Sequence, residues 1–431
     1  MAATTTFNIR KKIGGLLCCK LKSLFKHKKE EKTSINDLPD EVLLHILSFL
    51  PIRVAFRTMV LSKKWLTLCY LLPNLHFSSE QFDLLSNIAR QRILFRQMLD
   101  IVMFSPHSHH HLLVLKSFHL KCFFKIWEDE EDECFIFEKW IEAAKQRGVE
   151  DIHLCLFAGL FPVHLPPTTI FSCKTVVVMT LERIHITNMF HCVVDLPLLK
   201  TLKLWNNVHF EVGKDFMKLL SRCPKLEDLK IRSVIANDGV RVGDYLKPLS
   251  TLINARISLF EVPYTAVFNV KYLTVSEFGL SFPNEEINSF YKGFPVFQNL
   301  IKLQLYWRSY ILRPHILHDW DEVLKMLPYC PKLQTLKIEK AFMSLPMEDW
   351  EYPRRVPDCV SSNLTTCEII GYDALKEDFQ FATYILQNAR LLQIMNIFTV
   401  YPKPKVNPQF LDDLSSCPRI SPICKLTVSS D

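Results

Sequence analysis

The sequence contains one cluster of residues that could bind a metal ion. His107, His109, His110 and His111 follow one another closely, and imidazole is a common metal ligand in proteins. The cluster comes directly after Pro106, as a solvated loop does. We therefore interpret it as a surface loop, and we expect no metal site.

Acidic residues form two further clusters that could take part in proton transfer or bind a basic partner. The run EDEEDE covers residues 128–133, and we interpret it as an acidic surface insert. Asp40 and Glu41 are adjacent, but neighbouring residues on a helix point about 100° apart. Their place at a helix start is explained by the favourable interaction of carboxylates with the helix dipole.

Motifs for nucleotide binding or nucleophilic catalysis are missing from the sequence. The chain has only ten glycines in 431 residues and no GxGxxG, GxxxxGK, GxSxG or HExxH motif. Its 14 cysteines form no CxxC pair, so neither a zinc site nor a disulfide framework is indicated. Buried free thiols in a reducing compartment explain them better. We expect a protein that is not an enzyme and needs no cofactor.

The elements that could position a binding surface begin at Asp37. Pro39 suits the first position of a helix, and Pro51 ends that helix because the residue before a proline leaves the α region. Residues 53–60 can form a second short helix, and Ser62 is placed to cap a third. Three such short helices cannot bury all their apolar residues among themselves. Some of this surface must face the rest of the chain or another protein.

This helical segment resembles an F-box, the module that docks substrate receptors on a Skp-type adaptor in cullin-based ubiquitin ligases. The matching stretches are LPDEVLLHILSFLP, VLSKKWLTL and LPNLHF, in that order. Lys64 and Leu66 stand where the plant-type pattern usually has arginines, and Cys69 replaces a common second tryptophan. The resemblance implies adaptor contacts from the following residues: Leu38, Pro39, Ile46, Leu47, Leu50, Pro51, Val60 and Trp65.

The chain after residue 77 repeats one apolar pattern. The pattern is an apolar residue, two others, an apolar residue, one other and a third apolar residue. It occurs in CPKLEDLKI at Cys223–Ile231, CPKLQTLKI at Cys330–Ile338 and LPLLKTLKL at Leu196–Leu204. Successive copies are mostly 23 to 33 residues apart, which predicts leucine-rich repeats. Each repeat contributes a short strand, and stacked neighbours complete the core. The repeat between Leu252 and Val270 is short, so its assignment is open. Further matches to the pattern begin at Val149, Val176, Leu252, Val270, Leu300, Leu364, Leu392 and Ile423. Helical spacing between strands predicts an outer layer at residues 212–221, 320–327 and 379–388.

The last eighty residues resemble the FBD region that closes many plant F-box and leucine-rich-repeat proteins. WEYPRRVPDCV at Trp350–Val360 leads into a stretch that we interpret as strand, turn at Gly371, helix over Asp378–Asn388, strand, helix and strand. The chain thus resembles the plant F-box/FBD/leucine-rich-repeat family from residue 34 onward. The expected fold class is α/β, a three-helix F-box followed by an irregular horseshoe of repeats that the FBD region caps. The expected divisions are a basic tail at 1–33, the F-box at 34–77, repeats at 78–345 and the FBD region at 346–431.

Positive charge is concentrated in the N-terminal tail. Residues 1–32 hold nine Lys or Arg and two Glu, which equals the whole chain's net charge of +7. The balanced body argues against nucleic-acid binding. Three interpretations of the tail stay open: contact with an anionic membrane, with palmitoylation of Cys18 or Cys19; a nuclear signal; and a disordered leader. No apolar run reaches the 18 residues that span a bilayer.

These features predict a substrate-recognition subunit of a Skp-cullin-F-box (SCF) ubiquitin ligase. Its expected partners are a Skp-type adaptor, cullin through that adaptor, and an unidentified protein target held by the repeats. The expected location is the nucleus or cytoplasm, with peripheral membrane association through the tail. The alternative is a membrane-associated or nuclear interaction scaffold without ubiquitin transfer.

Overall fold

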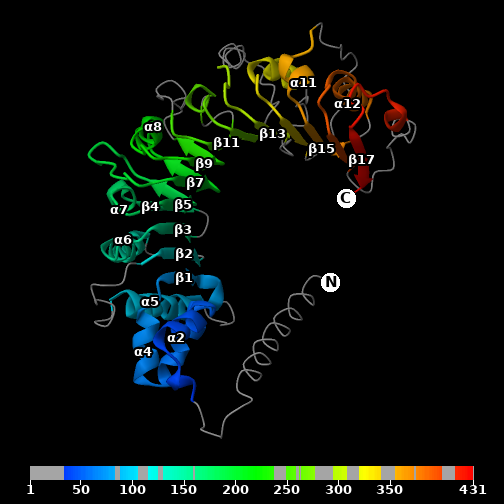
Figure 1. The fold of residues 1–431 in the computed structure, drawn as a ribbon. Coiled ribbons are helices and arrows are strands. Elements are labelled where there is room, and N and C mark those ends of the chain that lie inside the picture. Colours follow the sequence, from blue (N-terminus) through cyan, green and yellow to red (C-terminus); the bar gives the residue numbers. More distant parts are fainter. Residues whose placement is uncertain are drawn as a thin grey trace, which may run out of the picture.

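The protein folds as an arch, with strands along its inner side and helices along its outer side (Figure 1). The computed structural model describes residues 34–82, 88–104, 115–124, 130–158, 161–236, 249–258, 262, 264–276, 295–307, 320–340, 355–372, 375–399 and 413–430. A helical unit stands at one end and a long parallel sheet follows it. The predicted α/β fold class is therefore confirmed.

The helical unit has the three short helices that the sequence predicts. Its elements are η1 (Ile35–Asp37), α2 (Asp40–Ser48), α3 (Ile52–Arg57), η2 (Thr58–Val60) and α4 (Lys63–Tyr70). Pro39 and Pro51 occupy the N-cap positions of α2 and α3. Ser62 is the N-cap of α4, but its side chain makes no capping hydrogen bond, so only its position was predicted correctly.

A parallel sheet runs through the whole arch, with one strand from each repeat. Neighbouring strands pair in parallel along its length. In order across this main sheet, the strands are β1 (Asn74–Ser78), β2 (Ser117–Phe124), β3 (Asp151–Ala158), β5 (Val178–Glu182), β7 (Thr201–Trp205), β9 (Asp228–Ile231), β11 (Asn254–Ser258), β12 (Tyr272–Ser276), β13 (Lys302–Trp307), β14 (Thr335–Lys340), β15 (Thr366–Tyr372), β16 (Ile394–Thr399) and β17 (Lys425–Ser430).

The apolar positions of the repeats face the core as predicted, with one exception. Leu202, Leu204, Leu229 and Ile231, for example, are fully buried, and the polar residues between them are not. The short repeat that begins at Leu252 is genuine, because β11 and β12 are adjacent strands of the sheet.

The exception is Ile423, which is 62% exposed. It precedes β17, the last strand of the described sheet, where no further repeat stacks on it. An apolar position at the end of a repeat array lacks the neighbour that buries its counterparts elsewhere.

The main sheet begins earlier than the sequence analysis placed it. β1 pairs with β2 directly after the helical unit, and neither strand was predicted. Leu72, Leu75 and Phe77 have the spacing of the repeats and are buried, so the LPNLHF stretch already carried the signal. A single apolar core consequently runs from Leu43 in α2 into the repeats.

A second, smaller parallel sheet lies beside the first part of the main sheet. Its strands are β4 (Phe161–Leu165), β6 (Ile184–Ile186), β8 (Val208–Phe210) and β10 (Val234–Ala236). The turns that lead into three of these strands contain Arg183, Asn206, Asn207 and Ser233, all with positive φ. Left-handed residues at these corners redirect the chain from one sheet to the other.

Helices form the outer layer (Figure 1). The predicted helices of this layer are confirmed as α8 (Gly213–Ser221), α10 (Trp320–Met326) and α12 (Lys376–Asn388). Gly371 was predicted in a turn, but it lies within β15, where the register with β16 shifts. Further helices among the described residues are η3 (Ser79–Phe82), α5 (Ile88–Phe104), α6 (Glu130–Gln146), α7 (Pro167–Phe171), η6 (Tyr264–Ala266), η7 (Leu327–Tyr329) and α11 (Asp358–Ser362).

Candidate functional site

The best-formed candidate surface lies on the helical unit at the N-terminal end of the described chain. Leu43 and Leu47 are one helical turn apart on α2, and both are fully buried. The same helix turns Val42 outward, at 42% exposed, and its C-cap residue Phe49 is 73% exposed. The helix is therefore amphipathic, but apolar residues also stand on its outer side.

Two residues of α4 hold the segment that leads into α2. The Trp65 indole N–H donates to the side-chain oxygen of Asn36 at 2.6 Å. Lys64 donates to the carbonyl oxygens of Asn36 and Leu38 at 3.0 and 2.7 Å and lies 3.1 Å from a carboxylate oxygen of Asp40. Lys64, which stands where the plant-type pattern usually has an arginine, thus fixes the start of α2 through these contacts.

The helical unit is also tied to the sheet. Arg53 donates to the carbonyl oxygen of Gln81 at 2.6 Å, and its guanidinium lies 4.6 Å from the ring centroid of Phe82. Gln81 and Phe82 belong to η3, directly after β1. A partner bound to the helices is consequently held at a defined place relative to the arch.

The structure divides the eight predicted adaptor contacts into three groups. Pro39, Pro51 and Val60 are exposed, with Val60 at 87%. Leu47 and Trp65 are buried among the helices. The remaining three, Leu38, Ile46 and Leu50, are half-buried.

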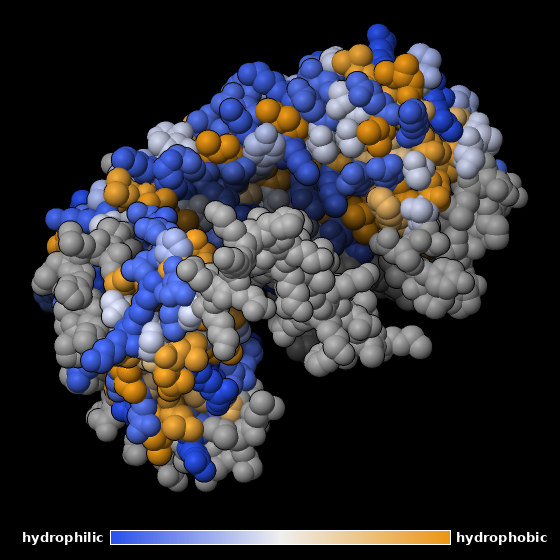
Figure 2. Space-filling model, turned by 60° about the horizontal axis from the view of Figure 1, so that its bottom comes forward, coloured by the Kyte–Doolittle hydropathy of each residue, from blue (hydrophilic) through white to orange (hydrophobic). Residues whose placement is uncertain are grey.

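Several exposed apolar residues of the same unit were missed. Phe49, Val54 and Leu61 are 73%, 42% and 56% exposed, and Ile35 is 50% exposed. Figure 2, which brings this end of the molecule forward, shows hydrophobic side chains gathered there. Their apolar character was visible in the sequence, but their outward direction depends on how the three helices pack.

The inner face of the main sheet is polar and carries a row of histidines next to the helical unit. His76, His119 and His153 are in register on β1, β2 and β3, and the first two rings stack with centroids 4.1 Å apart. His153 lies 2.8 Å from a carboxylate oxygen of Glu182. This hydrogen bond holds the pKa of Glu182 below its ordinary value.

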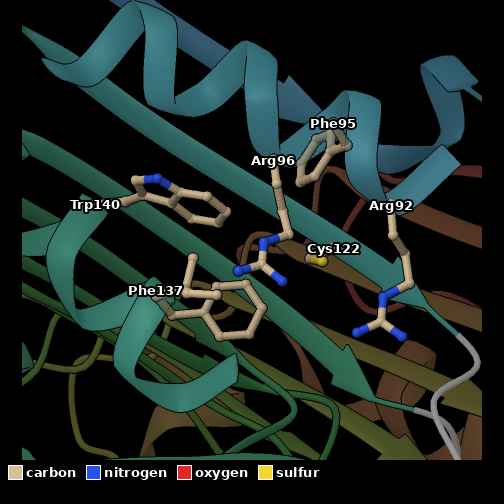
Figure 3. A pocket seen from close by; sticks show the side chains of 7 residues that line it. Arg92, Phe95, Arg96, Cys122, Phe137 and Trp140 are labelled. Atoms are coloured by element: carbon tan, nitrogen blue, oxygen red, sulfur yellow. The ribbon is translucent and has the colours of Figure 1, made fainter. Parts of the chain in front are cut away.

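A small cleft lies between α5 and α6 in the described part of the chain. Figure 3 shows Arg92 and Arg96 projecting from α5, with Phe137 and Trp140 opposite on α6 and Cys122 of β2 behind them. The space has room for about one water molecule. It is too small for an organic substrate.

The described cysteines are poorly suited to nucleophilic chemistry. The eleven cysteines whose side chains are described are free thiols, and all of them but Cys417 are buried. Burial raises the pKa of Cys155 to about 11, which disfavours the nucleophilic thiolate. Within the same ranges no group of His, Cys, Asp or Glu is arranged to hold a metal, and no helix could cross a bilayer. Cys18, Cys19 and the histidines at 107–111 lie outside the described residues.

Three protein-family models match the chain in the order that the fold suggests. Residues 35–77 match the F-box domain, residues 137–242 match the LRR repeats of an FBD-associated F-box protein, and residues 351–397 match the FBD. A putative F-box/FBD/LRR-repeat protein of Arabidopsis thaliana is 28% identical over 90% of this chain and 97% of its own length. The chain belongs to the F-box/FBD/LRR-repeat family.

Other Arabidopsis thaliana members of the F-box/FBD/LRR-repeat family match almost the whole chain. An F-box/FBD/LRR-repeat protein is 27% identical over 89% of both chains, and an FBD-associated F-box protein is 29% identical over 91% of this chain and 96% of its own. In this family member, the F-box match covers the helical unit and β1. The exposed apolar surface described above therefore belongs to the F-box.

Proposed function

We propose that this F-box/FBD/LRR-repeat protein is a non-catalytic, substrate-recruiting subunit of an SCF-type ubiquitin ligase. The F-box match at residues 35–77 supports an adaptor role in general. The observation that carries the proposal is the set of exposed apolar residues on that F-box, including Phe49 and Val60. Exposed apolar side chains gathered on one surface are typical of a protein-binding site.

The adaptor surface would combine exposed and half-buried residues. Pro39, Pro51 and Val60 would contact the Skp-type adaptor directly, and Phe49 and Leu61 would extend that contact. The half-buried leucines and isoleucine would line the base of the surface. Leu47 and Trp65 would act from beneath, by holding α2 against α4.

The mechanism is proximity. The adaptor and cullin would place a ubiquitin-loaded conjugating enzyme near a target bound elsewhere on this chain. A lysine of the bound target would then meet ubiquitin at a high effective concentration, without catalytic groups from this protein. We retain 34–77 for the F-box, 78–345 for the repeats and 346–431 for the FBD region as part of the proposal.

Co-purification of the full chain with a Skp-type adaptor tests this function. We expect a Phe49→Asp, Val60→Asp variant to lose the adaptor, because it places charge in the apolar contact while both side chains are exposed in the free protein. Phe190→Asp is the matched control, since Phe190 is 79% exposed but lies in the repeats.

Two outcomes would reject the proposal. One is a wild-type chain that retains no more adaptor than the double variant does. The other is an equal loss of adaptor in Phe190→Asp, because the binding surface would then not be the F-box.

A further inference from the structure

Three cations stand side by side on the inner face of the main sheet. Lys203 of β7 is in register with Lys230 of β9, which is in register with Arg256 of β11. The residues on either side of each cation point into the core, and all three cations are half-buried. Adjacent strands lie about 4.8 Å apart, so the row is roughly 10 Å long.

Two aromatic side chains flank the last cation of this row. The Arg256 guanidinium lies 5.9 Å from the ring centroid of Trp205 and 5.1 Å from that of Tyr306. Gln304 donates to the Tyr306 hydroxyl oxygen at 2.8 Å, which leaves the hydroxyl proton for another acceptor. The aromatic rings hold the guanidinium in place and offer apolar area beside it.

The row is not neutralised within the described part of the chain. No aspartate or glutamate there forms an ion pair with Lys203 or Arg256, whereas Lys230 pairs with Asp228 at 3.0 Å. Of the three cations, only Lys230 therefore has a described carboxylate within ion-pair distance. The row thus has uncompensated positive charge.

Two groups on neighbouring parts of the inner face do have carboxylate partners. On one side, His153 is hydrogen-bonded to Glu182, and on the other Lys337 lies 3.5 Å from Glu368. The row itself spans only three adjacent strands. A nucleic acid needs basic residues along a longer path to neutralise successive phosphates.

We propose that Lys203, Lys230 and Arg256, with Trp205 and Tyr306, bind an extended acidic peptide through carboxylates two residues apart. Alternate side chains of an extended peptide lie on one side at a spacing of about 7 Å, so two such carboxylates fit within the cationic row. This inference rests on the proposed function, because the peptide would be a segment of the recruited target.

A binding assay with the full chain tests the assignment. The probes are fluorescent decapeptide pools with randomised flanks: one carries Glu at positions 4 and 6, one carries Gln there, and one carries phosphoserine there. Oligouridine is a fourth probe. We expect the Glu pool to bind at least about tenfold more tightly than the Gln pool, because hydrogen bonds from the cations to a charged carboxylate are stronger than those to a neutral amide.

Variants of the row locate that binding. Lys203→Gln combined with Arg256→Gln should remove the difference between the Glu and Gln pools. Lys337→Gln should keep it, because that lysine lies on the same sheet but already has a carboxylate partner. Circular dichroism confirms that the variants remain folded.

The inference is overturned if the Glu and Gln pools bind equally, or if the double variant binds the Glu pool as the wild type does. Tighter binding of the phosphoserine pool or of oligouridine would overturn the assignment to carboxylates. The Lys203, Arg256 double variant should still co-purify with the Skp-type adaptor. Failure of peptide binding with the adaptor retained would therefore reject only this inference and not the adaptor function.

Discussion

The Lys340 ammonium lies 2.7 Å from a carboxylate oxygen of Asp378, and both side chains are almost completely buried. Lys340 ends β14 of the repeats, and Asp378 stands in the first turn of α12 in the FBD region. The Trp320 indole N–H donates to the same carboxylate oxygen at 3.1 Å, and its ring stacks on Phe381. A charged pair inside an aromatic cluster thus joins the repeats to the FBD region.

Asp378→Ala should destabilise the protein by about 3–5 kcal/mol, because it leaves the Lys340 ammonium buried without its carboxylate. Urea unfolding followed by circular dichroism measures the loss. Glu368→Ala is the control, since the partly exposed pair of Lys337 and Glu368 should contribute less than about 1 kcal/mol. Similar losses in both variants would show that burial does not set the strength of the Lys340 pair.

Gly371→Ala should also lower stability, for two separable reasons. Gly371 has a φ of 78°, and a β-carbon there would lie 2.1 Å from the Lys340 carbonyl oxygen. Asparagine tolerates a left-handed backbone better than alanine does, but it adds the same β-carbon. We therefore expect Gly371→Asn to lower the melting temperature about as much as Gly371→Ala. A much smaller effect of asparagine would mean that the backbone conformation, and not the contact with Lys340, requires glycine.

Loosening the segment before α2 should weaken adaptor binding without unfolding the F-box. Asn36→Ala with Lys64→Ala removes the hydrogen bonds that hold this segment to α4. Each of the three hydrogen bonds made by these side chains contributes about 0.5–1.5 kcal/mol. We therefore expect the affinity for the adaptor to fall at least about tenfold. Calorimetric titration and the melting temperature check this. Thr67→Ala, on the exposed side of α4, should change neither, and an unchanged affinity in the double variant would contradict the predicted role.

Acidification should weaken the fold near the histidine row. Partial burial, with the imidazole of His119, lowers the pKa of His76 to about 4; His153 and Lys121 act in the same direction and Asp151 opposes them. The unfolded chain, with an ordinary pKa near 6.5, therefore binds more protons than the folded chain between these values. The contribution of His76 to the free energy of unfolding is therefore fully present above about pH 6.5 and is lost as the pH falls toward 4.

The urea midpoint at pH 7.5 and 5.5 measures this contribution. His76→Gln cannot bind the proton, so its midpoint should fall less on acidification than that of the wild type. Equal decreases in the two proteins would show that His76 does not contribute to the pH dependence.

The local patterns of the sequence determined much of this protein. The start of a helix near Pro39 and its end before Pro51 follow from the backbone restrictions of proline, which need no distant contact. The recurring spacing seen in Cys223–Ile231 and Cys330–Ile338 places most strands of the main sheet and their buried faces, because the alternation of side chains along a strand is also local. The F-box residues could be recognised from their order alone, and the family matches agree with that recognition.

The tertiary structure decided which of these residues are available to a partner. Leu47 and Trp65 are buried while Phe49 and Val60 are exposed, because packing between three short helices and the sheet selects the outward side. Lys203, Lys230 and Arg256 are about 26 residues apart in sequence and become neighbours only through strand register. Lys340 and Asp378 likewise meet only when the FBD region stacks on the repeats. Periodicity specifies the direction of a side chain within its own element, but its neighbours depend on long-range packing.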